Sequence, residues 1–446
     1  MNQPFYLVAG LGKTGRSIAG YLQRRQLPYA VYDTREQVEG LDEFCHDFPG
    51  IEVFSGEFPA DLYSRLTCII TSPGVALDAP FMEEARRRDI AIIGDIECLA
   101  REIKAPVIAI TGTNGKSTVT TLVGDMAKAA GLTVAVAGNI GLPVLDLLDD
   151  GQNYDVWVLE LSSFQLDLVH SLAPVASTIL NVSPDHLDRH HTLAAYVAAK
   201  QRVYHQSALC VYNREDEHTL PVGEATTARS TSYGLDEPET DNWGIIRHQG
   251  DYYLARGKER LLAVDQLRLK GKHNWQNALA ACALAEALNI DVRHMISVLS
   301  SFSGLPHRCQ WVRTLDGVDW INDSKGTNIG ATISAISGIG GSMAGKIVLI
   351  AGGLGKGADF SELQITVGDF VRTAVLIGAD AEKIAQALSG VTPIVRATTL
   401  DEAIRLARAR AQPGDVVLLS PACASQDMFR DFNHRGEAFA QIVGML

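Results

Sequence analysis

The feature that most constrains this chain is a pattern that occurs three times: a short apolar run, a glycine-rich turn, and a helix-like segment. The pattern opens at Phe5, Pro106 and Lys346. Apolar runs that lead through glycine turns into helices are typical of parallel sheets, whose strands are covered by helices on both faces. The sequence therefore predicts an α/β protein with parallel sheets.

The chain of 446 residues is long enough for about three domains at roughly 150 residues each. We predict domain boundaries near Asp95 and at Gly304-Leu305-Pro306, which gives domains 1–95, 96–304 and 305–446. The polar region 213–257 is predicted as a loop or a small β excursion. The predicted strands are 29–32, 68–71, 107–110, 134–136, 156–159, 177–180, 347–350, 374–377 and 416–419, and the predicted helices are 17–26, 80–88, 194–206 and 274–288.

Composition excludes several classes of protein. The net charge of −13 repels polyanions, so we expect no nucleic-acid partner. No apolar run approaches the ~18 residues of a membrane span, and no signal peptide is visible at the start. The seven cysteines are widely spaced without a C-x-x-C pair, which favours a reducing compartment over a disulfide framework or a zinc site. We therefore expect a cytoplasmic protein without a membrane partner.

The strongest local motif is Thr111-Gly112-Thr113-Asn114-Gly115-Lys116-Ser117-Thr118, which lies between a predicted strand and a helix. Glycines let backbone N–H groups approach a phosphate, the lysine supplies a positive charge, and the serine hydroxyl can bind Mg²⁺. Ile110 stands where the general P-loop pattern has glycine, so this loop is a shortened relative. The alternative is a structural glycine turn with a solvated lysine.

Two further strands of the central domain end in polar residues. Glu160 closes the run 156–159 and is followed by Ser162 and Gln165, while Asp185 and His186 follow the run 177–180. Carboxyl ends of parallel strands meet at one sheet edge, so these residues favour a metal and phosphate site beside the loop. The alternatives are an ordinary strand-end acid and a structural histidine.

The first glycine turn, Gly10-Leu11-Gly12-Lys13-Thr14-Gly15, fits G-x-G-x-x-G, and Asp33 closes the next strand. That pattern is compatible with NAD, with a sugar nucleotide, and with a tight turn that only caps a helix. In the last third of the chain, Lys356 lies between two glycines and can approach an anion closely.

These motifs together resemble the Mur ligase superfamily over essentially the whole chain. The resemblance is carried by 112–118, Glu160, His186, Gly271 to Asn277, Pro306-His307-Arg308 and 323–327, and in the flanking domains by 33–35, 72–74 and 419–425 with Phe432. It implies a dinucleotide-binding-like first domain, a central P-loop ATPase-like domain, and a Rossmann-like third domain that binds the incoming amino acid.

The resemblance also implies an activity: ATP-driven amide formation between UDP-N-acetylmuramoyl-L-alanine and D-glutamate through an acyl phosphate, in peptidoglycan precursor synthesis. The implied cofactors are ATP and Mg²⁺ at two sites, with Mn²⁺ as the alternative ion, and we expect a monomer. A closely related alternative is a folylpolyglutamate synthetase. A nucleotide switch and an NAD dehydrogenase are more distant alternatives, and the latter explains only the first hundred residues.

Carried over residue by residue, the resemblance implies four groups of site residues. The ATP site comprises Gly112, Thr113, Asn114, Gly115, Lys116, Ser117, Thr118, Asn274, Asn277, Arg308, Asp323 and Lys325. The metal ligands are Ser117, Glu160, His186 and Lys200. The sugar-nucleotide pocket comprises Lys13, Thr14, Asp33, Thr34, Arg35, Ser72 and Gly74, with Asn139, Ser162 and Gln165 facing the muramoyl part. The D-glutamate pocket comprises Thr327, Lys356, Ser425 and Phe432.

Lys200 is the residue on which pattern and resemblance disagree. On pattern alone, a lysine on an amphipathic helix is a solvated charge. The Tyr196-Val-Ala-Ala-Lys200 context resembles a lysine that family members carbamylate with CO₂, which converts a cation into an anionic metal ligand. Carbamylation requires a neutral amine, so we predict that Lys200 is shielded from water and is catalytic together with Lys116 and His186.

Overall fold

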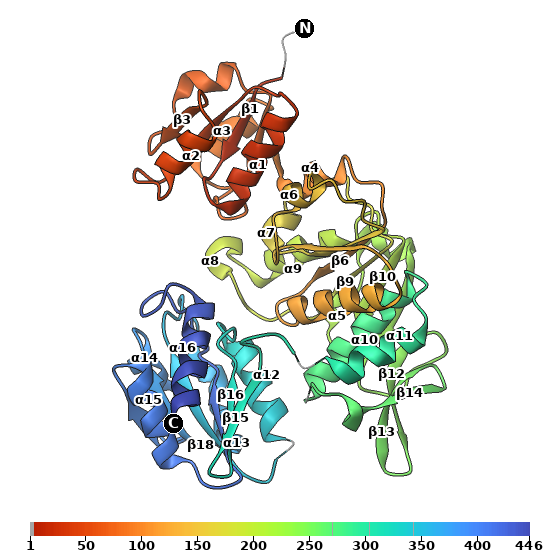
Figure 1. The fold of residues 1–446 in the computed structure, drawn as a ribbon, viewed down its shortest axis with the longest axis vertical. Coiled ribbons are helices and arrows are strands. Elements are labelled where there is room, and N and C mark those ends of the chain that lie inside the picture. The colour runs from red at the N-terminus through yellow and green to blue at the C-terminus, as the bar shows by residue number, and fades with distance from the viewer. Residues whose placement is uncertain (1–3, 270, 303, 342) are drawn as a thin grey trace. The chain divides into compact units, whose positions relative to one another are not determined.

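The computed structural model describes residues 4–269, 271–302, 304–341 and 343–446, drawn as a ribbon in Figure 1. The chain forms two compact units. The first comprises Met1–Val182, Arg189–Tyr233 and Ala280–Met295, and the second comprises Ser183–Asp188, Gly234–Leu279 and Ile296–Leu446. The strands before the three glycine-rich turns are β1 (Tyr6–Ala9), β6 (Val107–Thr111) and β17 (Ile347–Gly352), and each belongs to a different sheet.

The first sheet has five parallel strands in the order β3-β2-β1-β4-β5. All residues of β2 and β4 are buried because helices cover both faces of the sheet. The bounds are β2 (Tyr29–Asp33), β3 (Glu52–Ser55), β4 (Cys68–Thr71), β5 (Ala91–Gly94), α1 (Lys13–Arg24), α2 (Leu41–Asp47), α3 (Pro80–Arg87) and α4 (Asp95–Ala100).

The second sheet provides six parallel strands to the first unit, in the order β11-β10-β9-β6-β8-β7. The register pairs Glu160 with Ile110 on one side and with Gly138 on the other, so three strand ends meet at one edge. The bounds are β7 (Val134–Gly138), β8 (Val156–Glu160), β9 (Ala176–Ile179), β10 (Leu209–Asn213), β11 (Arg229–Tyr233), α5 (Lys116–Ala129), α6 (Val144–Leu148), α7 (Ser163–Leu166), α8 (Leu187–His190), α9 (Leu193–Gln201), α10 (Lys272–Glu286) and α11 (Val292–Ser301).

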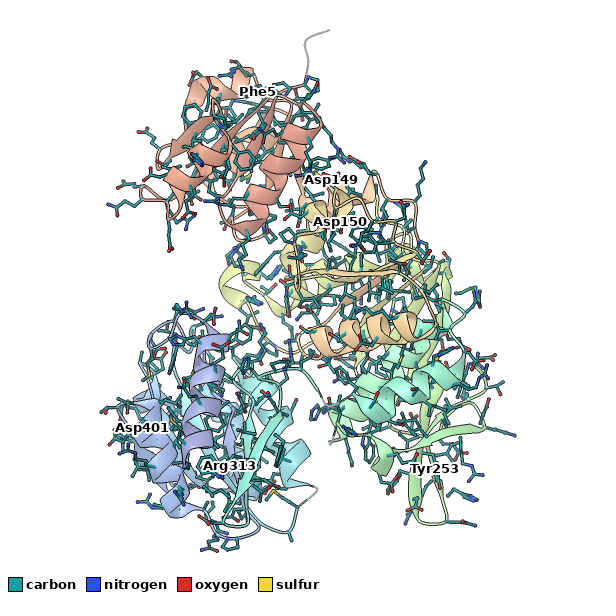
Figure 2. The ribbon with its side chains drawn as sticks, in the orientation of Figure 1. Phe5, Asp149, Asp150, Tyr253, Arg313 and Asp401 are labelled. Atoms are coloured by element: carbon teal, nitrogen blue, oxygen red, sulfur yellow. The ribbon has the colours of Figure 1, made fainter. Side chains whose placement is uncertain are left out.

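The second unit contains an antiparallel meander of β12 (Trp243–His248), β13 (Asp251–Arg256) and β14 (Glu259–Ala263). Figure 2 shows the side chain of Tyr253 on β13. Of the two readings of the polar region 213–257, the small β excursion is therefore confirmed.

The third sheet lies in the second unit and has the order β15-β16-β20-β17-β18-β19. The edge strand β15, which carries Arg313 (Figure 2), is antiparallel to β16, and the other pairs are parallel. The bounds are β15 (Gln310–Leu315), β16 (Val318–Asn322), β18 (Val371–Ile377), β19 (Ile394–Arg396), β20 (Val416–Leu419), α12 (Ile329–Gly340), α13 (Gln364–Phe370), α14 (Ala381–Ala387), α15 (Leu400–Arg410) and α16 (Phe432–Met445).

These sheets confirm the predicted α/β class, but one predicted helix ends early. The segment 194–206 is helical only to Gln201, and a 3₁₀ turn over Arg202–Tyr204 follows. The tighter turn carries the Tyr204 hydroxyl into the core, where it accepts the Ile179 amide and lies within hydrogen-bonding distance of two backbone carbonyls. In the part of the chain that the structure describes, no helix combines the length and apolarity needed to cross a membrane.

Candidate active site

The phosphate loop opens α5 in a form suited to an anion. Gly115 adopts φ 81° directly before the helix, a conformation that glycine adopts without strain. The first turn of α5 holds no acidic residue, and no side chain caps it. The backbone N–H groups at this helix end are therefore oriented toward the space where a phosphate would bind.

Asn181, at the end of the neighbouring strand, holds the loop in shape. Its Oδ1 accepts the Asn114 amide at 2.9 Å, its Nδ2 donates to the Asn114 carbonyl at 3.1 Å, and its carbonyl accepts the Thr113 amide. Asn181 was not among the predicted site residues. Its role as an anchor depends on β9 lying next to β6, which the linear sequence does not reveal.

Two lysines converge on one backbone carbonyl of the loop. Lys116 Nζ donates to the carbonyls of Gly112 and Thr113 at 2.8 and 2.9 Å, and Lys200 Nζ donates to the Gly112 carbonyl at 2.8 Å. Lys200 is only 1% exposed, so its side chain is shielded from water as predicted. Its Nζ lies 4.4 Å from the centre of the Tyr196 ring, and the Tyr196 hydroxyl lies 3.3 Å from that of Thr113.

Tyr196 was not among the predicted site residues, although a signal for it was present. Its spacing of four residues from Lys200 places both side chains on the same face of α9. His190, also missed, contacts Ser163 Oγ through Nε2 at 2.9 Å and packs against the Tyr196 ring.

Glu160 provides the carboxylate at the edge where β7, β8 and β6 end. Its Oε1 accepts Asn139 Nδ2 at 2.9 Å, while Oε2 is buried and has no hydrogen-bond partner among the described residues. A buried carboxylate oxygen without a partner is costly unless a cation or proton donor joins it. Glu160 therefore fits a magnesium ligand, and buried Ser117 in the first turn of α5 provides a hydroxyl of the type such a site uses.

Within the described residues, no group of three or more histidine, cysteine, aspartate or glutamate side chains is arranged to hold a metal. A site built on Glu160 and Ser117 thus relies on other oxygen ligands. Phosphate oxygens of a nucleotide and a carbamate on Lys200 are ligands of that kind.

The second unit contains a cavity of about 250 Å³ that brings together three predicted residues. His186, Thr327 and Lys356 all line it. Asp185, beside His186, accepts a hydrogen bond from Asn328 Nδ2 at 3.0 Å, which ties the 183–188 segment to the start of α12. Lys356 is exposed and adopts φ 51°.

Asp323 lies at the end of β16 in a buried hydrogen-bond network. Burial raises the pKa of Asp323 to about 6, although Ser420 Oγ donates to Oδ2 at 2.7 Å and the Cys309 amide donates to Oδ1 at 3.1 Å. Arg308 lies close enough to act on this carboxyl electrostatically. Asp323 and Arg308, both predicted for the ATP site, are therefore neighbours.

Arg435 joins the loops that carry the predicted amino-acid pocket and was missed from the sequence. Its side chain is 1% exposed and donates to Ser324 Oγ, to the Ser324 carbonyl and to the Cys423 carbonyl. Next to these loops, Lys325 Nζ lies 3.8 Å from the centre of the Phe432 ring. The buried Ser425 Oγ has no hydrogen-bond partner among the described residues, as expected of a hydroxyl that bonds to a ligand.

The first glycine turn builds a different site. Asp33 accepts the Leu11 amide at 2.8 Å and a two-pronged ion pair from Arg35. Burial opposes ionisation of Asp33, but the hydrogen bonds from Arg35 and Leu11 outweigh it and lower the pKa to about 2. Ser72 Oγ donates to the Gly10 carbonyl at 3.3 Å, which places it beside this turn. Lys13 and Thr14 open α1, Thr34 is exposed, and Gly74 is exposed.

Two pairs of predicted site residues are hydrogen-bonded to each other. Ser162 and Gln165 form a reciprocal capping box at α7, in which Ser162 Oγ accepts the Gln165 amide and Gln165 Oε1 accepts the Ser162 amide. Asn277 Nδ2 donates to Asn274 Oδ1 at 3.2 Å on buried turns of α10. A substrate contact by these side chains adds to, or exchanges with, the bonds they already make.

Three family domains match the chain in order. Residues 5–94 match the Mur ligase MurD-like N-terminal domain, residues 110–285 the Mur ligase middle domain, and residues 307–423 the Mur ligase glutamate ligase domain. The chain therefore belongs to the Mur ligase family, which the resemblance of its motifs predicted.

Two relatives that match this chain over nearly its full length have the same name. The UDP-N-acetylmuramoylalanine--D-glutamate ligase of Legionella pneumophila is 63% identical over 444 residues, covering 99% of both chains. The Pseudomonas aeruginosa protein of the same name is 48% identical and covers 98% of this chain and 97% of its own length. The structure of the UDP-N-acetylmuramate-alanine ligase of Thermotoga maritima matches the whole chain with a TM-score of 0.60 at 20% identity, which shows a shared fold.

Proposed function

We propose that this protein is an ATP-dependent ligase that joins D-glutamate to UDP-N-acetylmuramoyl-L-alanine. The observation that carries the proposal is the convergence of Lys116 and Lys200 on the Gly112 carbonyl, in a phosphate loop whose strand edge also presents Glu160. Full-length relatives at 63% and 48% identity, each named as a ligase of this kind, support the choice of substrates.

The chemistry follows from the weakness of a carboxylate as an acylating agent. Attack of the L-alanyl carboxylate on the γ-phosphorus of ATP breaks the bond to ADP and forms an acyl phosphate. The D-glutamate amine then attacks the carbonyl carbon, phosphate leaves, and the amine loses a proton. Both steps bring anions together, so the protein's main task is to position and neutralise charge.

In this proposal the phosphate loop binds the ATP phosphates through the backbone N–H groups that begin α5 and through Lys116. Ser117 and Glu160 would hold Mg²⁺, and His186 with a carbamylated Lys200 would serve a second ion of the same type, with Mn²⁺ as the alternative. When bound, such ions neutralise the phosphate oxygens and polarise the phosphorus. Asn274, Asn277, Arg308, Asp323 and Lys325 complete the ATP site.

The two other substrates are assigned to the flanking domains. The first glycine turn, with Asp33 and Arg35, would bind the UDP part, and Asn139, Ser162 and Gln165 would face the muramoyl part. Thr327 and Lys356, which line one cavity, would bind D-glutamate together with Ser425 and Phe432. We further propose that the enzyme acts as a monomer in the cytoplasm.

Phosphate release tests the reaction and its specificity. With UDP-N-acetylmuramoyl-L-alanine and ATP present, D-glutamate should support release, while L-glutamate, D-aspartate and L-lysine should not. Equal release with L-glutamate would contradict the proposal.

Lys356→Ala should raise the KM for D-glutamate about 10- to 100-fold with little change in kcat, since a cation facing a substrate carboxylate is mainly a binding contact. If the KM for ATP rises instead, Lys356 belongs to the nucleotide site.

Other measurements separate the rival functions. A folylpolyglutamate synthetase would show no binding of a uridine nucleotide in calorimetry, and an NAD dehydrogenase would change absorbance at the nicotinamide band. A nucleotide switch would release ADP without both co-substrates. The proposed ligase requires strict dependence of ADP release on UDP-N-acetylmuramoyl-L-alanine and D-glutamate together.

A further inference from the structure

A cavity in the first unit lies on α9 and contains none of the residues assigned to the proposed site. It has a volume of about 750 Å³ and runs along α9, the 3₁₀ turn after it, and the segment 222–228. We call it the α9 groove. A volume of this size is within the range of small-molecule sites in proteins.

The charged lining of the α9 groove is one arginine. Arg202 lines the groove with His170 and His205, and no aspartate or glutamate does so among the residues whose side chains the structure describes. Arg202 donates Nε to the Leu166 carbonyl and one Nη to the Val169 carbonyl, which fixes the guanidinium at the groove. An arginine without an acidic neighbour in the described lining is notable in a chain with a net charge of −13. It favours a ligand with an anionic group.

The rest of the lining is apolar. Val222 is 57% exposed, and Ala198, Ala225 and the buried Tyr204 also contribute to the groove. Exposed apolar side chains gathered beside a fixed guanidinium are the pattern of a site that binds an apolar body with an anionic head. Asp167 lies within electrostatic reach of Arg202 but not in the lining, so it weakens the positive potential without filling the groove.

The same helix connects the α9 groove to the phosphate loop. Ala198, Gln201 and Arg202 line the groove, while Lys200, within the same turn, donates to the Gly112 carbonyl. The next residue pair along the chain, Val203 and Tyr204, is buried, and Tyr204 bonds the Ile179 amide of β9. A ligand that shifts α9 therefore changes the position of Lys200 against the loop.

We propose that the α9 groove is a regulatory site for a small amphipathic anion, an apolar body that carries a sulfonate, carboxylate or phosphate. Binding needs only the groove, whereas its effect on turnover rests on the function proposed above. The effect acts through the helix turn that carries Lys200.

The test uses 1-anilinonaphthalene-8-sulfonate, an aromatic sulfonate whose fluorescence rises on binding. The full chain is titrated with ATP and UDP-N-acetylmuramoyl-L-alanine present at saturation, so that the proposed active site is filled. Ala198→Glu places a carboxylate in the groove and should weaken binding at least about 10-fold, because like charges repel in a confined site. Ala195→Glu is the matched control, an exposed alanine of the same helix outside the lining, and should bind as the wild type does.

Phosphate release measured with rising concentrations of the same probe tests the coupling. Wild-type and Ala195→Glu turnover should change with the probe, and Ala198→Glu turnover should change only at about 10-fold higher concentration. Equal probe binding by both variants, or loss of binding once the substrates are present, would overturn the groove site. A protein that binds the probe in the groove but makes no amide would instead contradict the proposed function.

Discussion

The glycine turns that precede α1 and α5 share a sequence pattern but form different sites. In the first, the carboxylate of Asp33 is engaged by Arg35 and by the Leu11 amide, and Lys13 is exposed. In the second, Lys116 and buried Lys200 both donate to the Gly112 carbonyl. The first arrangement suits recognition of a ligand, whereas the second places two lysine side chains beside the loop where phosphate would react.

A glycine turn therefore identifies an anion-binding helix end but not the chemistry performed there. Both helices begin without a side-chain cap or an acid in the first turn. What separates them is the set of side chains that neighbouring strands and α9 bring to the turn. That set comes from residues far away in the sequence.

The largest expected effect is from paired lysine variants of the two turns. Lys116→Ala should lower the rate of phosphate release by about 10³-fold or more, because its charge is needed where negative charge is transferred. Lys13→Ala, the matched change in the first turn, should alter kcat little and raise the KM for the UDP substrate less than about 10-fold. Circular dichroism should show that both variants are folded. Equal losses of kcat in the two variants would contradict the different roles of the two turns.

Lys200→Ala should be the next most damaging change, with a loss of about 10²- to 10³-fold in turnover. If Lys200 acts as a carbamate, added acetate or formate should restore part of the rate by providing the missing anionic oxygen, whereas Lys116→Ala should not respond. Intact-mass measurement of the wild type at raised CO₂ should show the added carbamate. Full activity of Lys200→Ala would return this lysine to a structural role.

Glycine variants of the first turn test its role through protein stability and substrate binding. A Cβ at Gly15 would clash with the Gly10 carbonyl oxygen, whereas a Cβ at Gly12 would meet nothing within 4 Å. Gly15→Ala should therefore lower the free energy of unfolding by about 3 kcal/mol. Gly12→Ala should change it by less than about 1 kcal/mol but raise the KM for the UDP substrate, since that position is left open for a ligand. Thermal unfolding and kinetics on both variants provide the check.

The smallest expected effect concerns acid stability of the first turn. Because the folded pKa of Asp33 is lowered to about 2, ionised Asp33 stabilises the fold above its unfolded pKa and loses that contribution as pH falls toward 2. Arg35→Ala should therefore destabilise the protein at pH 6, and the difference in melting temperature from wild type should shrink below pH 4. The Arg35 side chain is 55% exposed, so solvent screening keeps the effect below about 1 kcal/mol. A difference independent of pH would rule out this ion pair as its source.

Local signals predicted much of the fold. The apolar runs 29–32, 68–71 and 107–110 became β2, β4 and β6 with bounds that agree to within one residue, because buried parallel strands are short, continuous and bounded by turns. Helix ends were predicted less well. α1 begins at Lys13 rather than Ser17, since the glycine turn leads directly into the helix. α9 ends at Gln201, since burial of Tyr204 requires a tighter turn.

The family, the three glycine turns and the identity of the charged residues that follow them could all be predicted from the sequence. Which of those charges is buried, and what each contacts, depends on the tertiary structure. Lys200 reads as a surface residue by its helical pattern, yet it is 1% exposed because α9 packs that face against the phosphate loop. Asn181 reaches Asn114 across 67 residues, and Arg435 reaches Ser324 across 111. Contacts of that range depend on strand order and on the packing of helices across sheets, which no local pattern of side chains encodes.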